Sequence, residues 1–160
     1  MKVTMRKIYE HLFVGTDSDC FDNKTGWATV HACKSPCHQR AVGYRGSLPS
    51  SHPHYLVLEK GPNLYLNMID PAQPLFMMPL FTNFLAFARN NWHEGKNILI
   101  HCNLGESRAP SLALLFLAKI GSVIPNDSFD SAHQEYRKID PHYYPRQGIQ
   151  IYLRKNWEEL

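Results

Sequence analysis

A cysteine and an arginine separated by five residues are the side chains whose types and spacing most clearly indicate chemistry. Cys102 follows an apolar run, and Arg108 precedes an apolar segment of helical character. A strand that feeds a tight loop ending at a helix N-terminus gathers unpaired N–H groups around one point, and the helix dipole adds positive potential. Such a cradle binds an anion and favours the thiolate of Cys102, the nucleophilic form. The planar fork of Arg108 suits two phosphoryl oxygens.

The loop reads His101-Cys102-Asn103-Leu104-Gly105-Glu106-Ser107-Arg108, or H-C-x-x-G-x-S-R. This loop resembles the signature C-x5-R loop (P-loop) of the cysteine-dependent protein phosphatases, most closely the small dual-specificity branch. The resemblance implies that Cys102 attacks phosphorus and forms a phosphocysteine intermediate, while Arg108 and the loop amides hold the phosphoryl oxygens. It also implies that His101 tunes Cys102 through hydrogen bonds, and that the substrate-binding residues are Asn103, Leu104, Gly105, Glu106, Ser107 and Arg108. The alternative interpretation is a buried, inert cysteine at a strand end, with Arg108 as a surface charge.

Asp70 stands where a predicted strand gives way to a loop, directly before Pro71. Cleavage of a phosphate ester needs an acid to protonate the departing oxygen, and a carboxylic acid above the cradle can supply that proton. The separation of 32 residues (102 − 70) from Asp70 to Cys102 is similar to that between acid and nucleophile in dual-specificity phosphatases. We expect Asp70 to be the general acid, and then the base toward the hydrolytic water. The alternative is a plain turn former, and the other candidate acids are Asp17, Asp19 and Asp22.

The chain departs from the phosphatase pattern at Ala109, where members of that family usually carry Ser or Thr. The missing hydroxyl would normally donate to the sulfur as it leaves the phospho-enzyme, so we expect slow turnover unless Ser107 or Ser111 substitutes. The loop residue Leu104 brings no charge, and Glu106 brings a negative one. Highly anionic inositol phosphates should therefore be disfavoured.

A group of thiol and imidazole side chains precedes these residues: His31, Cys33, Cys37 and His38. Its spacing, H-x-C-x3-C-H, lies across a strand end, and no second Cys/His pair is evident in the sequence to complete a tetrahedral site in the usual way. We expect no metal and no cofactor. In a chain without an export signal the cysteines should be reduced thiols. An open alternative is that Cys33 or Cys37 protects Cys102 by a reversible disulfide.

Length and composition indicate one globular domain. The 160 residues are 44% hydrophobic and 19% charged, which is enough for one core. No apolar run approaches the roughly 18 residues of a membrane span, and the basic N-terminus MKVTMRKIYEHLFVG lacks an apolar signal core. The net charge of +3 is small and dispersed, which argues against a nucleic-acid partner. We expect a cytoplasmic, monomeric catalytic domain over residues 1–160 that meets no membrane and acts on phosphorylated proteins or peptides.

The apolar pattern predicts the elements that must position these residues. Strands are expected over residues 12–15, 28–33, 55–58, 64–69 and 98–100. Helices are expected over residues 76–92 and around 151–157. A further helix should run from about residue 108 to a C-cap at Gly121, and another should begin after an N-cap at Asn126. Residues 34–53, which carry Lys34, Arg40 and Arg45, read as a surface excursion bordering the active site. The fold is predicted to be α/β, with a mostly parallel central sheet flanked by helices on both faces. The family resemblance implies four or five strands.

Three other functions remain open at this point. A phosphate-binding or phosphopeptide-binding module without turnover is supported by Ala109 alone. A rhodanese-type sulfurtransferase also uses a loop cysteine, but the spacing to Arg108 and the presence of Asp70 favour phosphate. An RNA 5′-phosphatase shares the loop, but it needs a basic groove, and the net charge of +3 does not indicate one. The choice between phosphotyrosine and phosphoserine or phosphothreonine is not fixed by the sequence.

Overall fold

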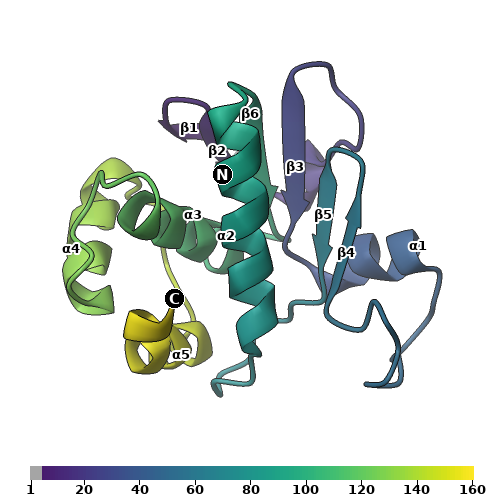
Figure 1. Ribbon diagram of the computed structural model, residues 1–160. Helices are drawn as coiled ribbons and strands as arrows, with labels where there is room; N and C mark the ends of the chain where they lie inside the picture. Colours follow the sequence, from purple (N-terminus) through teal and green to yellow (C-terminus); the bar gives the residue numbers. More distant parts are fainter. Residues whose placement is uncertain (1–4) are drawn as a thin grey trace.

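The computed structural model describes residues 5–160 and contains one six-stranded sheet with helices around it (Figure 1). The first four residues of the basic N-terminal segment lie outside the described part of the chain. The strands are β1 (Arg6–Tyr9), β2 (Leu12–Gly15), β3 (Trp27–His31), β4 (Val57–Lys60), β5 (Asn63–Leu66) and β6 (Asn97–His101). The helices are η1 (Asp17–Asp19), η2 (Lys34–His38), α1 (Gln39–Val42), α2 (Met78–His93), α3 (Arg108–Lys119), α4 (Phe129–Ile139), α5 (Gln147–Asn156) and η3 (Trp157–Glu159).

The strand order is β1-β2-β6-β3-β5-β4. The four inner strands run parallel, and each edge strand pairs antiparallel with its neighbour. The α/β class and the mostly parallel sheet are therefore confirmed. The expected number of four or five strands was too low, because β1 has only one buried side chain, Ile8, and leaves no apolar run in the sequence.

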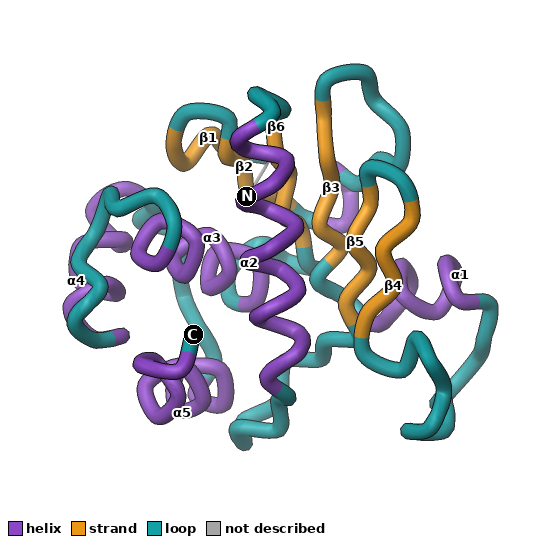
Figure 2. The backbone as a smooth tube through the Cα atoms, in the orientation of Figure 1, coloured by secondary structure: helices purple, strands orange, loops and turns teal. Residues whose placement is uncertain are grey.

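The two faces of the sheet are covered differently (Figure 2). Because side chains alternate along a strand, one face carries the large apolar residues. Val14, Val30 and Ile100 lie in register on that face and belong to the main core, against which α2 and α3 pack. α4 packs against α3, and α5 against α4. The opposite face carries His31 and His101 and is approached by the short helix η2. Helices thus lie on both faces, but the long ones share one face.

The segment 34–53 is more structured than a surface excursion. Cys37 and His38 in η2 are buried, and Cys37 packs in a small second cluster with Cys33 and Tyr65. The sheet's second face needs apolar cover, and this segment provides it. Arg40 and Arg45 are exposed, and Lys34 is half-buried.

Two predicted helix boundaries need correction. α4 is capped by Ser128 rather than Asn126, because Ser128 has extended backbone angles and its hydroxyl accepts the N–H of Ser131. α3 ends at Lys119 and its C-cap is Ile120, so the predicted cap, Gly121, is the residue after the C-cap. No helix within residues 5–160 is long and apolar enough to cross a membrane.

Candidate active site

The loop between β6 and α3 forms a closed turn around the sulfur of Cys102. Cys102 follows β6 directly and is 2% exposed, and Arg108 is the first residue of α3. Gly105 has a φ of 71°, and a Cβ there would lie 3.0 Å from the carbonyl oxygen of Gly15. Only glycine fits this position without strain, so the central glycine of the motif has a physical reason in this chain.

Three carbonyl groups of the loop are bonded from outside, which turns the backbone N–H groups inward. The donor and acceptor pairs are Asp17 N to Asn103 O at 3.3 Å, Arg6 Nη2 to Gly105 O at 2.8 Å, and Tyr144 N to Glu106 O at 2.8 Å. A ring of inward N–H groups at a helix N-terminus is an anion-binding cradle.

The sulfur of Cys102 accepts two of these N–H groups. The donors are Gly105 N at 3.3 Å and Ala109 N at 3.4 Å. Hydrogen bonds from backbone amides stabilise a thiolate more than a thiol. Cys102 Sγ thus lies where N–H groups of the loop and of the first turn of α3 converge.

Arg108 lies at the other end of the loop and is held by two hydrogen bonds. Its Nη1 donates to Met68 O at 2.9 Å, and its Nη2 donates to Asn103 Oδ1 at 2.7 Å. Its Nε is buried and has no hydrogen-bond partner among the described residues. A buried donor without a partner is costly, so Nε is a donor of this guanidinium that a bound anion can satisfy. The Asn103 amide is itself fixed by Asp17 Oδ2 and Ser35 O.

Asp70 reaches the loop through Ser107. The Ser107 hydroxyl donates to Asp70 Oδ1 at 3.2 Å and accepts the N–H of Arg146 at 2.9 Å. Burial raises the pKa of Asp70 above its usual value, against the opposing effects of Ser107, Arg108 and Arg146. A raised pKa keeps a carboxylic acid protonated at higher pH, which suits a general acid.

The other candidate acids are placed differently. Asp17 contacts Asn103 in the loop, since its carboxylate accepts from the Asn103 amide and its backbone N–H donates to the Asn103 carbonyl. Asp19 accepts the N–H of Thr16 at 2.8 Å in a capping box, and Asp22 accepts the hydroxyl of Tyr65 at 3.0 Å. Asp70, which accepts the Ser107 hydroxyl at the loop, remains the expected acid.

His101 does not touch the sulfur of Cys102 through its hydrogen bonds. Its Nδ1 lies 3.4 Å from the Cys102 carbonyl oxygen, and its Nε2 lies 2.8 Å from His31 Nδ1 on the opposite face of the sheet. Burial lowers the pKa of His101, but contact with Cys20 and the charge of Cys33 outweigh burial and raise the pKa above its usual value. His101 is therefore tied to a second group of side chains as well as to the loop.

Neither neighbouring serine takes the place of the missing hydroxyl at position 109. The Ser107 hydroxyl is engaged with Asp70, and the Ser111 hydroxyl lies 2.7 Å from Tyr143 Oη. All four cysteines are free, and Cys37 Sγ lies 3.9 Å from Cys20 Sγ, so a reversible disulfide of Cys33 or Cys37 with Cys102 stays a prediction.

No pattern in the sequence pointed to Arg6, which supports the loop from the unpredicted strand β1. Its guanidinium bonds the Gly105 carbonyl and is held by Asp140 at 2.7 and 2.8 Å. Arg6 lies 134 residues from Asp140 and 99 from Gly105. Such a contact has no periodicity or motif that a single sequence would reveal.

Comparison with known proteins gives a fold-level match. No family model and no curated protein sequence matches the chain. Among solved structures, human DUSP28 aligns over 99% of this chain and 96% of that chain, with 14% identity and a TM-score of 0.62. The human tyrosine phosphatase-like serine/threonine/tyrosine-interacting protein aligns over 98% and 96%, with 16% identity and a TM-score of 0.67. PTPMT1 in complex with PI(5)P aligns over 97% and 95%, with 16% identity and a TM-score of 0.66. The chain has the fold of the dual-specificity phosphatases, as the loop resemblance predicted.

Proposed function

We propose that this protein hydrolyses phosphomonoesters on phosphoproteins through a cysteinyl-phosphate intermediate, with residues 1–160 as one catalytic domain. The observation that carries the proposal is the sulfur of Cys102, which accepts two amide N–H groups inside a loop whose carbonyls are bonded outward. Arg108 and Asp70 lie at the same loop. A nucleophile, an anion cradle and an acid are the three parts that this reaction needs.

In the first step the thiolate of Cys102 attacks phosphorus in line with the leaving oxygen. The S–P bond forms, the P–O bond breaks, and Asp70 gives its proton to the leaving oxygen. The inward N–H groups of residues 103–108 and Arg108 Nε hold the three equatorial oxygens, on which the charge is spread.

In the second step water attacks the cysteinyl phosphate. Asp70, now a carboxylate, accepts a proton from the water, the S–P bond breaks, and Cys102 departs as a thiolate. Gly105 and Ala109 donate their N–H groups to the departing sulfur. Since Ser107 and Ser111 are engaged elsewhere, the sulfur departs without a hydroxyl donor, and this step should be the slower one.

The surroundings of the sulfur support a phosphorylated side chain presented on a protein. Leu104 in the loop is 68% exposed, Ile69 beside Asp70 is 49% exposed, and Tyr144 is 74% exposed. Tyr144 donates its N–H to the loop, so its position is fixed beside the cradle. Exposed apolar side chains around a buried sulfur favour an aromatic phosphate ester over a small, highly charged one.

A binding module without turnover is the second candidate, and Ala109 is the observation that favours it. A phosphoinositide is a further substrate class to test, since PTPMT1 was solved with PI(5)P. The negative charge of Glu106 in the loop argues against a highly anionic substrate.

The test is hydrolysis by purified protein of a panel of phosphotyrosine, phosphoserine and phosphothreonine peptides, PI(5)P and a 5′-phosphorylated RNA. Cys102→Ser is the control. We expect release of phosphate from phosphopeptides, strongest for phosphotyrosine, and none from the control. Peptide binding without release would support the module, and preferential hydrolysis of RNA or PI(5)P would replace the proposed substrate class.

A further inference from the structure

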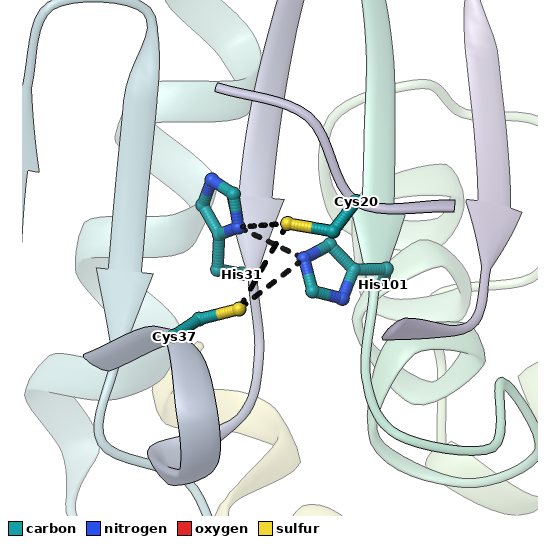
Figure 3. Close-up of side chains that lie close together, drawn as sticks. All are labelled: Cys20, His31, Cys37 and His101. Carbon is teal, nitrogen blue, oxygen red and sulfur yellow. Dashed lines mark hydrogen bonds between the residues drawn. The ribbon is translucent and has the colours of Figure 1, made fainter. Parts of the chain in front are cut away.

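Two cysteines and two histidines converge on the sheet face opposite the main core. The ligand atoms of Cys20, His31, Cys37 and His101 all lie within 4.8 Å of one another (Figure 3). They come from four segments: the loop after η1, β3, η2 and β6. All but Cys20 are buried. Residues so distant in the sequence meet here because His31 and His101 are register partners on adjacent strands.

The distances between these atoms approach the edges of a zinc tetrahedron. Cys20 Sγ lies 3.4 Å from His31 Nδ1, Cys37 Sγ lies 3.9 Å from His101 Nε2, and the two sulfurs are 3.9 Å apart. Bond lengths of about 2.3 Å to sulfur and about 2.0 Å to nitrogen give edges of about 3.3–3.8 Å. The nitrogen–nitrogen edge, 2.8 Å, is shorter, and a small separation of the two rings brings it to that length.

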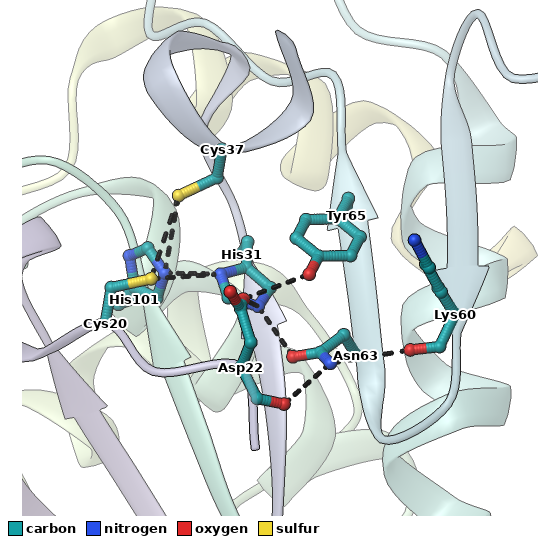
Figure 4. A network of polar contacts seen from close by, with 8 residues as sticks. All are labelled: Cys20, Asp22, His31, Cys37, Lys60, Asn63, Tyr65 and His101. Atoms are coloured by element: carbon teal, nitrogen blue, oxygen red, sulfur yellow. Dashed lines mark hydrogen bonds and ion pairs between the residues drawn. The ribbon is translucent and has the colours of Figure 1, made fainter. Parts of the chain in front are cut away.

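The tautomer of His31 is fixed by Asn63 (Figure 4). The Asn63 Nδ2 donates to the carbonyls of Asp22 at 2.7 Å and Lys60 at 3.4 Å, so its Oδ1 faces His31. Because that oxygen only accepts, His31 Nε2 carries the proton and donates it at 2.9 Å. The Nδ1 of His31 therefore presents a lone pair to the cluster.

His101 has the complementary arrangement. Its Nδ1 faces the Cys102 carbonyl oxygen at 3.4 Å, which again only accepts, so the proton belongs on Nδ1 and Nε2 presents a lone pair. Two lone pairs then face each other 2.8 Å apart. With both rings neutral that contact is repulsive, and either a proton on His101 Nε2 or a metal ion bound by the four atoms relieves it. Histidines that bind metal usually donate their other N–H to an amide, carboxylate or carbonyl oxygen, as both do here.

We propose that Cys20, His31, Cys37 and His101 bind one Zn²⁺ ion. Two thiolates and two imidazoles are the ligand set of closed, tetrahedral structural zinc sites. On binding, the two thiols lose their protons to solvent and four metal–ligand bonds form, with no change of oxidation state. Since the protein fills all four positions, the ion is structural rather than hydrolytic.

The proposed site differs from the sequence-based expectation of no metal. The second Cys/His pair that the sequence did not reveal is Cys20 and His101, which join Cys37 and His31. His38 belongs elsewhere: its Nδ1 lies 2.7 Å from Tyr44 Oη and its Nε2 lies 2.9 Å from the His54 carbonyl oxygen.

The proposed ion would tie the cradle to the opposite face of the sheet. His101 directly precedes Cys102, and its carbonyl accepts the N–H of Ala32, which follows β3. A metal bond to His101 would therefore fix the strand end from which the loop starts. The proposal concerns metal binding and stands whether or not the protein is a phosphatase.

The first experiment measures zinc in the reduced, full-length protein after reconstitution with zinc and removal of excess ion. We expect one zinc per chain by elemental analysis and native mass spectrometry. Cys37→Ser and His31→Gln should lose it, and Asn63→Leu should lower the affinity about 10- to 100-fold by freeing the tautomer of His31. Cys33→Ser is the matched control, because Cys33 packs beside Cys37 and Tyr65 but is not one of the four proposed ligands. This variant should keep the zinc ion.

The second experiment does not depend on the folding of any variant. Reconstitution of the wild-type protein with Co²⁺ should give the strong visible bands of a tetrahedral site and a near-ultraviolet sulfur-to-cobalt band. The proposal is wrong if the reduced protein binds neither ion, or if Cys20→Ser/Cys37→Ser binds zinc as the wild type does. A Cys20–Cys37 disulfide in zinc-free protein purified under reducing conditions would also overturn it and assign the pair to thiol chemistry.

Discussion

The sulfurs at the end of β6 lie in two opposite environments. Cys102 Sγ is surrounded by N–H donors from Gly105 and Ala109. The sulfurs of Cys20 and Cys37 instead face the ring nitrogens of His31 and His101 at 3.4 and 3.9 Å. N–H donors around a sulfur stabilise the thiolate as a nucleophile. Imidazole nitrogens beside a sulfur can instead bind the same metal ion as the thiolate. The neighbours of a cysteine, rather than the cysteine itself, decide which chemistry it performs.

The two environments meet at consecutive residues of the chain, His101 and Cys102. His101 is the last residue of β6 and points to one side, where it meets its register partner His31. Cys102 begins the loop on the side of α3. Because side chains alternate along a strand, the Cys102 loop and the cysteine–histidine cluster lie on different sides. A substitution in one should therefore leave the other intact.

The largest expected effect is that of Cys102→Ser. We expect no measurable hydrolysis, because the alcohol is a far weaker nucleophile, while vanadate or phosphate still binds and the zinc content stays the same. Phosphate release, vanadate binding and elemental analysis check the three parts. Substantial turnover would rule out Cys102 as the nucleophile, and loss of zinc would show that the two sites are not separate.

Asp70→Asn should show the next largest effect, and it should depend on the leaving group. We expect losses of about 100-fold or more for alkyl phosphates, but only small losses for aryl phosphates with acidic phenols, which need little protonation. Rates across a leaving-group series measure this. Equal losses throughout would move the acid to another residue, with Asp17 as the next carboxyl group at the loop.

The same variant has a defined pH signature. The first step needs Asp70 protonated, and burial raises its pKa, so cleavage of alkyl phosphates should fall as pH rises through that raised value. Asp70→Asn cannot lose a proton and should remove this fall. A pH–rate profile with an unchanged alkaline limb in the variant would argue against the assignment.

Arg108→Lys should reduce kcat about 100-fold or more, since an ammonium cannot reproduce a planar fork held at both Nη atoms with Nε free. Steady-state kinetics measure the loss. Zinc content is the internal control and should not change. Retention of most of kcat would show that Arg108 serves mainly to hold Met68 and Asn103.

The smallest expected effect is that of Ala109→Ser. One hydrogen bond to a charged sulfur is worth about 1.5–3 kcal/mol, or about ten- to a hundredfold in rate if it is fully expressed at the transition state. We expect the wild type to show a burst of leaving-group release before slower turnover, and the variant to show faster turnover with a smaller burst. Rapid-mixing kinetics resolve the two phases. With no burst in the wild type and unchanged turnover in the variant, sulfur departure would not be the slow step.

The sequence by itself determined the parts of the protein that depend on short-range order. The strand 97–101, the loop and α3 follow one another in about two dozen residues, so an apolar run, a central glycine and a helix start were enough to place Cys102 and Arg108. Strand β2 was predicted at its observed bounds for the same reason. The position of Asp70 rested on family spacing, and the structure adds the hydrogen bond through Ser107 that the spacing did not contain.

Only the tertiary structure decided which distant side chains share a site. Parallel pairing of β3 with β6 sets His31 beside His101, and η2 folds back over that face with Cys37. The same pairing of remote segments places Arg6 on the loop carbonyl of Gly105. Strand order and crossover connections are fixed by the packing of the whole core, so neighbours 64 to 134 residues apart leave no pattern along the chain. The candidate nucleophile Cys102 could therefore be identified from the sequence, whereas the residues that support its loop and the proposed metal-binding cluster could not.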